Sequence, residues 1–78
     1  MITISSPHQL GVAVRITRKQ LGLTQPQLAL AAGVGVRFIV DLEAGKPTLR
    51  LKSVLKVIDA LGGKLHISGL SDLTSDPM

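Results

Sequence analysis

Five residues around the start of a predicted helix over residues 36–44 carry groups that could read the edges of DNA bases. They are Gly35, Val36, Arg37, Val40 and Asp41. The guanidinium of Arg37 can donate two parallel hydrogen bonds to O6 and N7 of guanine, and the two valines can offer methyl groups to thymine. Asp41 could accept a hydrogen bond from cytosine N4, or it could hold Arg37, which precedes it by one helical turn. Gly35 would let the backbone approach DNA closely.

The first element that would position these residues is a short helix that starts at Thr24. Thr24 and Gln27 have the T-x-x-Q spacing of a capping box. Leu28 begins an apolar pattern at helical spacing, and Ala29 is small enough to let a second helix cross closely. Gly33 can take the positive φ of a tight turn, which ends this helix and leads into the next.

The second element is the helix over residues 36–44, whose apolar face consists of Phe38, Ile39 and Leu42. Gly45 ends it in the left-handed conformation that often follows a helix. Two short helices joined by a glycine turn form a helix-turn-helix. The second helix of this motif lies in the major groove, so the pattern predicts binding to double-stranded DNA. The alternative is a plain helical hairpin in a small bundle.

The same stretch resembles the Cro/repressor (XRE) helix-turn-helix family. The matching residues are Thr24-Gln25, Leu28-Ala29, Ala32-Gly33-Val34, Ile39, Leu42-Glu43 and Gly45-Lys46. The resemblance implies a small, λ-repressor-like domain of four helices. It further implies a structural ion pair between Arg18, on the preceding helix, and Glu43 at the end of the recognition helix.

Phosphate contacts are expected on both sides of the recognition helix. The resemblance assigns one to Gln25, at a helix N-terminus whose free N–H groups point toward the same phosphate. Other candidates lie in the loop after Gly45 and at the start of the last helix, and they are Lys46, Thr48, Arg50 and Lys52. Arg50 stands where the family often has a serine N-cap, so Thr48 is expected to cap this helix instead.

The chain of 78 residues is long enough for one domain. We expect an N-terminal arm or short strand at 1–6, the helix-turn-helix DNA-binding domain at 7–62, a dimerisation strand at 63–70 and a flexible tail at 71–78. The domain should open with a helix over about 7–21, which Ser6 and Gln9 would start with a second capping box.

The end of the chain predicts a dimer. The last helix, at about 51–61, has a continuous apolar stripe of Leu51, Val54, Leu55, Ile58 and Leu61. Residues 64–68 alternate polar and apolar side chains and predict a strand. A lone strand needs a partner, which could be residues 2–4 or the same strand of a second copy. The expected fold is therefore all-α with a short C-terminal β-strand, and Val54, Leu61, Leu65 and Ile67 are expected at a homodimer interface.

Composition narrows the function further. The net charge of +4 suits a polyanion. The sequence has no cysteine, so it has no thiolate metal site, and its two histidines are far apart; we expect no metal and no cofactor. Charged or polar residues break every apolar run well short of the roughly 18 residues of a membrane helix. We expect a cytoplasmic protein that joins the bacterial nucleoid when it binds DNA, with no membrane partner.

The four helices, the SSPHQL helix start and the terminal strand together resemble the HipB-type antitoxins. That resemblance implies a dimeric repressor on a palindromic operator and a HipA-like kinase toxin as partner. Two alternatives remain: a stand-alone XRE-type repressor without a toxin, and a protein-interaction module that does not bind DNA. An enzyme is not expected, because the sequence offers no carboxylate pair in an identifiable pocket, no nucleophile with a base and no phosphate loop. The Gly-Val-Gly at 33–35 is not a dinucleotide site, because it has neither the preceding strand nor the third glycine.

Overall fold

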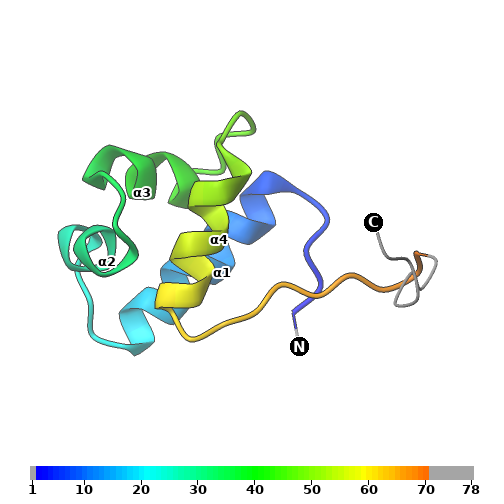
Figure 1. Ribbon diagram of the computed structural model, residues 1–78, viewed down its shortest axis with the longest axis horizontal. Helices are drawn as coiled ribbons and strands as arrows, with labels where there is room; N and C mark the ends of the chain where they lie inside the picture. The colour runs from blue at the N-terminus through cyan, green and yellow to red at the C-terminus, as the bar shows by residue number, and fades with distance from the viewer. Residues whose placement is uncertain (1, 71–78) are drawn as a thin grey trace, which may run out of the picture.

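Four helices follow one another along residues 2–70, which are the residues that the computed structural model describes (Figure 1). They are α1 (Pro7–Gln20), α2 (Gln25–Ala32), α3 (Val36–Glu43) and α4 (Leu51–Ala60). Helix α3 packs against both α1 and α2, and α4 packs against α2. The all-α fold predicted from the sequence is thus confirmed, with helix bounds within one residue of those expected. The predicted tail at 71–78 lies outside the described residues.

The side chains that cap the first two helices explain where these helices begin. The Thr24 hydroxyl accepts a hydrogen bond from the Gln27 N–H at 3.2 Å, and the Thr24 N–H donates to the Gln27 side chain at 2.8 Å, which confirms this capping box. The Ser6 hydroxyl likewise accepts from the Gln9 N–H at 3.1 Å. The Gln9 side chain accepts from the N–H of Ser5, however, so the expected reciprocal box with Ser6 is wrong by one residue.

Two glycines with positive φ end the helices of the helix-turn-helix. Gly33 has a φ of 71° after α2, and Gly45 has a φ of 83° after α3. In each case the residue after the glycine donates its N–H back across the last turn: Val34 to the Ala29 carbonyl and Lys46 to the Asp41 carbonyl, both at 3.0 Å. This Schellman arrangement satisfies carbonyls that the helix itself leaves unpaired.

Residues from all four helices meet in one apolar core. Its members are Val14 of α1, Leu28 and Ala29 of α2, Ile39 and Leu42 of α3, and Val54 and Val57 of α4. The stripe predicted for the last helix is only partly right: Leu51 and Leu55 are exposed, whereas Val57, which was not assigned to it, is fully buried. The buried face of α4 is therefore rotated away from the predicted one.

The two ends of the described chain run near each other beside α1 and α4, without forming a sheet. In Figure 1 the N-terminal arm and the segment after α4 leave the helices on the same side. Residues 2–4 and 64–68 have no strand in this single chain, so the predicted C-terminal strand is absent from it. A strand requires a ladder of hydrogen bonds to a neighbour, and the short N-terminal arm does not supply one.

Candidate nucleic-acid interface

The helix-turn-helix is held by the turn between α2 and α3 and by the core beneath it. Ala29 of α2 is 2% exposed where α2 packs against α3. Ile39 and Leu42 form the buried inner face of α3. Phe38 donates its N–H to the Gly35 carbonyl at 3.1 Å, which starts α3 without a side-chain cap. The buried inner face fixes which side of α3 points outward.

The five predicted base-contact residues lie along the outward side of α3 and at its start. Gly35, Val36 and Arg37 are exposed, and the Arg37 side chain is 84% exposed. Val40 and Asp41 are half-buried one turn later. The structure therefore brings an exposed guanidinium, an exposed valine and an open backbone position together on one surface, which is an arrangement suited to direct reading of base edges.

Asp41 is engaged with two cations. Its Oδ1 lies 3.3 Å from Arg37 Nε, and its Oδ2 lies 3.6 Å from Lys46 Nζ. The contact with Arg37 is the one-turn spacing that the sequence allows for. Lys46 lies in the loop after α3, and its contact with Asp41 was not predicted from the sequence spacing.

The side chains expected to contact phosphates differ in their exposure and in whether they already have a partner within the chain. Thr48, Arg50 and Lys52 are exposed, and Lys46 is exposed but paired with Asp41. Arg50 is the N-cap residue of α4 and no side chain caps this helix, so the expected capping by Thr48 is wrong. Gln25 is half-buried and donates from Nε2 to Glu43 Oε1 at 3.2 Å, so its amide is already occupied within the chain.

Arg18 and Glu43 form a buried ion pair that joins α1 to the end of α3. Arg18 Nε donates to Glu43 Oε2 at 2.7 Å and Arg18 Nη2 to Glu43 Oε1 at 2.9 Å, and the side chains are 9% and 5% exposed. Arg18 Nη1 also donates to the Leu23 carbonyl at 2.8 Å. The hydrogen bond to Glu43 raises the pKa of Arg18, although burial opposes it.

Gly11 is a positioning residue that sequence reasoning missed. A Cβ atom at this position would lie 2.5 Å from the Leu42 carbonyl oxygen and 2.8 Å from that of Glu43. Only glycine therefore lets α1 approach the C-terminal end of α3 this closely. The signal in the sequence was a glycine in the interior of a helix. Glycine destabilises a helix there, so its presence indicates that packing requires it.

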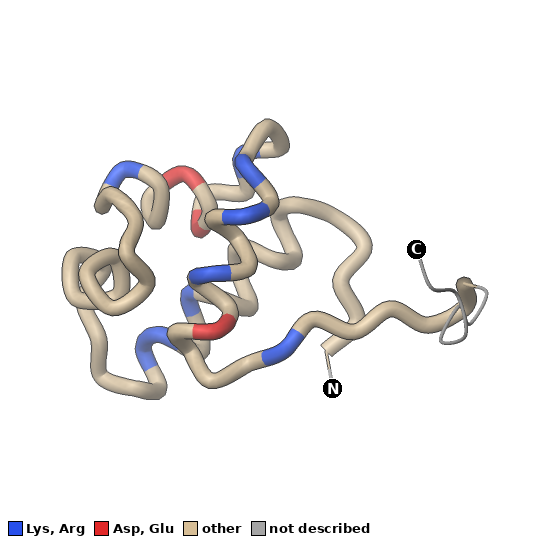
Figure 2. The backbone as a smooth tube through the Cα atoms, viewed as in Figure 1, with Lys and Arg blue, Asp and Glu red and all other residues tan. Residues whose placement is uncertain are grey.

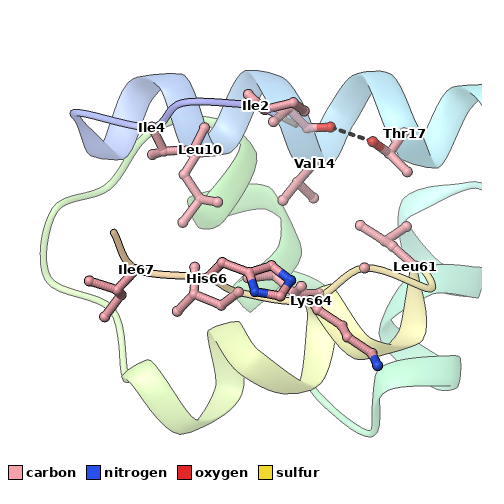
Figure 3. A pocket seen from close by; sticks show the side chains of 13 residues that line it. Ile2, Ile4, Leu10, Val14, Thr17, Leu61, Lys64, His66 and Ile67 are labelled. Atoms are coloured by element: carbon pink, nitrogen blue, oxygen red, sulfur yellow. Dashed lines mark hydrogen bonds between the residues drawn. The ribbon is translucent and has the colours of Figure 1, made fainter. Parts of the chain in front are cut away.

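The residues expected at a dimer interface do not all lie on the surface. Val54 is 7% exposed and packs in the core of the single chain, so it offers little surface of its own to a second copy. Leu61 is half-buried, and Leu65 and Ile67 are exposed. The last three line a groove of about 730 Å³ between α1, the N-terminal arm and the segment after α4, as Figure 3 shows.

Two features are absent from residues 2–70. No helix in that range is both long and apolar enough to cross a membrane. That part of the chain also contains no group of three or more histidine, cysteine or acidic side chains placed to hold a metal ion.

Comparison with known proteins identifies the family. A sequence profile described as Helix-turn-helix matches residues 14–67. The uncharacterized HTH-type transcriptional regulator y4mF of Sinorhizobium fredii is 53% identical over 64 residues, which are 82% of this chain and 84% of the relative. Chains of two solved structures, the HipA-HipB-O2-O3 complex and the HipB-O4 20mer complex, are each 27% identical with a TM-score of 0.81, over 91% of this chain and 100% of theirs. The chain therefore belongs to the XRE-type helix-turn-helix family of transcriptional regulators and resembles HipB.

Proposed function

We propose that this protein is a repressor that binds double-stranded DNA by sequence, with α3 in the major groove and without an enzymatic activity of its own. The observation that carries the proposal is the outward side of α3, where the 84% exposed Arg37 lies beside the exposed Val36. A guanidinium in this position can bind guanine through two hydrogen bonds. The resemblance to a chain of the HipB-O4 20mer complex supports the same reading.

The flanking charges fit this orientation. Lys46, Arg50 and Lys52 follow α3 in the loop and at the start of α4 (Figure 2), where they would border the same groove and contact phosphates. Gln25, another of the five candidates, would reach a phosphate with its side-chain amide only after the bond to Glu43 shifts, so we expect its backbone N–H to make that contact instead.

We infer that two copies bind a palindromic operator. The half-sites of such an operator lie about one helical turn apart and match a two-fold symmetric protein. The exposed Leu65 and Ile67 alternate along a segment with no strand partner in its own chain. Pairing of this segment between two copies would supply the missing ladder and cover both side chains.

A HipA-like kinase toxin is the partner we propose for the dimer, because the chain resembles one from the HipA-HipB-O2-O3 complex. The alternative is a stand-alone repressor. Affinity purification from native cells, followed by mass spectrometry, separates the two. Recovery of a kinase-like protein encoded beside this gene supports the antitoxin role, whereas recovery of the dimer alone supports the stand-alone repressor.

DNA binding itself is tested by selection. The protein is incubated with a library of random 30-base-pair duplexes, and bound DNA is amplified through several rounds. The proposal predicts enrichment of one palindromic sequence that resists competition by unrelated DNA. A library that stays random, together with no salt-dependent shift of any duplex, would instead support a protein-interaction module.

In the cell we expect the protein in the cytoplasm, and at the nucleoid when it is bound to DNA.

A further inference from the structure

Asp41 is the acidic residue that lies between the base-reading candidate and a phosphate-binding candidate. Its two carboxylate oxygens are divided between them, with Oδ1 at 3.3 Å from Arg37 Nε and Oδ2 at 3.6 Å from Lys46 Nζ. The Asp41 side chain is 19% exposed, whereas those of Arg37 and Lys46 are 84% and 50% exposed. One half-buried anion thus holds two exposed cations.

The backbone fixes this arrangement. Arg37 precedes Asp41 by four residues in α3, so the two share one side of the helix. Lys46 is brought back over the same turn because its N–H donates to the Asp41 carbonyl at 3.0 Å. That bond depends on the positive φ of 83° at Gly45. Asp41 is therefore placed where side chains from the helix and from the following loop can both reach it.

The pairing has unequal consequences for the two kinds of DNA contact. Arg37 is held through Nε, which leaves its two terminal nitrogens available for O6 and N7 of guanine. Attraction to phosphates depends on charge instead, and the carboxylate offsets part of the charge of both cations. A phosphate that approaches Lys46 must also displace the carboxylate or lie beside it. The penalty therefore falls on contacts that any DNA sequence can make.

We propose that Asp41 is a specificity-determining residue that weakens binding to non-cognate DNA by neutralising Arg37 and Lys46, while it leaves Arg37 able to read guanine. This inference rests on the proposed DNA-binding function and deepens it. Replacing the carboxylate by a neutral amide releases about one additional positive charge toward the phosphates. A gain of one phosphate contact steepens the dependence of log K on log salt by about 0.9 and strengthens binding about eightfold at 0.1 M salt.

The test measures binding of the full chain to a fluorescein-labelled, 30-base-pair duplex of mixed sequence, by anisotropy, between about 0.05 and 0.3 M NaCl. Asp41→Asn should bind about eightfold more tightly than the wild type at 0.1 M, with the steeper salt dependence. The matched control is Asp59→Asn, which makes the same charge change in the last turn of α4, on an exposed carboxylate without an ion pair among residues 2–70. It should change affinity less than about twofold, because charges beyond a Debye length of about 10 Å are largely screened.

Two more measurements sharpen the result. On the duplex selected by the wild type, Arg37 is expected to be bound to guanine, so Asp41→Asn releases only Lys46 toward phosphates there. The variant should therefore gain less affinity for this duplex than for mixed sequence, and the ratio of specific to non-specific affinity should fall. Asp41→Ala also removes the charge and favours helix, so it must act in the same direction if Asp41→Asn folds poorly. Thermal unfolding checks that each variant is folded.

The outcomes separate this proposal from the function on which it rests. Equal gains in Asp41→Asn and Asp59→Asn would overturn it, because net charge alone would then explain both. Weaker binding of Asp41→Asn to mixed-sequence DNA would also overturn it and make Asp41 a supporting residue for Arg37. If the wild type and all variants fail to bind any duplex, the proposed function itself is wrong.

Discussion

The guanidinium of Arg18 and the carboxylate of Glu43 face each other through two hydrogen bonds, of 2.7 and 2.9 Å, at the junction of α1 and α3. Glu43 also accepts a hydrogen bond from Gln25 at the start of α2, and Arg18 donates to the carbonyl of Leu23 in the preceding loop. This network links three helices at the end of the recognition helix. The orientation of α3 therefore depends on it.

Breaking this pair should destabilise the fold more than breaking a surface pair. Either Arg18→Met or Glu43→Gln leaves the remaining charge buried without a charged partner, and we expect each to lower the free energy of unfolding by about 3–5 kcal/mol. The double variant should lose clearly less than the sum of the two, since it leaves no orphaned charge. Urea unfolding of all four proteins measures this coupling. Additive losses would show that the two side chains do not interact.

Gly11→Ala should destabilise the protein although alanine is the better helix former. The added Cβ would lie 2.5 Å from the backbone oxygen of Leu42, so α1 and α3 must move apart, at a cost of about 1–3 kcal/mol. Gly35→Ser is the control, because its Cβ meets no atom within 4 Å and serine is a good N-cap. Thermal unfolding should show a lower midpoint for the first variant and an unchanged or higher one for the second. The reverse order would refute the close helix contact.

Leu65 and Ile67 should hold two copies together. The double variant Leu65→Lys/Ile67→Lys places two charges on the segment that we expect to pair between copies, so it should sediment as a monomer. Leu30→Lys is the matched control, because Leu30 is 85% exposed on α2, away from this segment. Sedimentation velocity should show a dimer for the control and for the wild type. A dimer formed by the double variant would place the interface elsewhere.

Lys46 should contribute to DNA binding without regard to sequence. Lys46→Ala removes one expected phosphate contact, so the salt dependence should become shallower by about 0.9 and every duplex should be bound more weakly by a similar factor. Lys56→Ala, on the exposed side of the second half of α4, removes the same charge outside the expected DNA contacts and serves as the control. A loss confined to the selected operator would mean that Lys46 contacts a base.

The helix bounds and the turn could be predicted because their causes are local. Thr24 and Gln27 cap α2 with side chains three residues apart, and Gly33 and Gly45 supply positive φ at the ends of α2 and α3. Such signals are complete within a few residues of sequence. The partnership of Arg18 and Glu43 came from the family resemblance instead, since 25 residues separate them.

The features that could not be predicted all depend on contacts between distant segments. The hydrogen bond from Gln25 to Glu43, the approach of α1 at Gly11 and the bridge from Lys46 to Asp41 arise only when the helices and loops are in place. The buried side of α4 was predicted only in part for the same reason, because packing against α2 decides that Val57 is covered. The expected terminal strand is absent from residues 64–68 because a strand needs a partner, and one chain does not provide it.

The central claim is that Arg37 on α3 reads DNA sequence. The most direct measurement compares the affinities of wild type and Arg37→Ala for the selected operator and for a scrambled duplex of the same length and composition, at one fixed salt concentration. We predict that Arg37→Ala loses about 1–3 kcal/mol of discrimination between the two duplexes, while its weak binding to scrambled DNA persists. If Arg37→Ala discriminates between operator and scrambled DNA as well as the wild type does, the assignment of Arg37 as the base-reading residue is wrong.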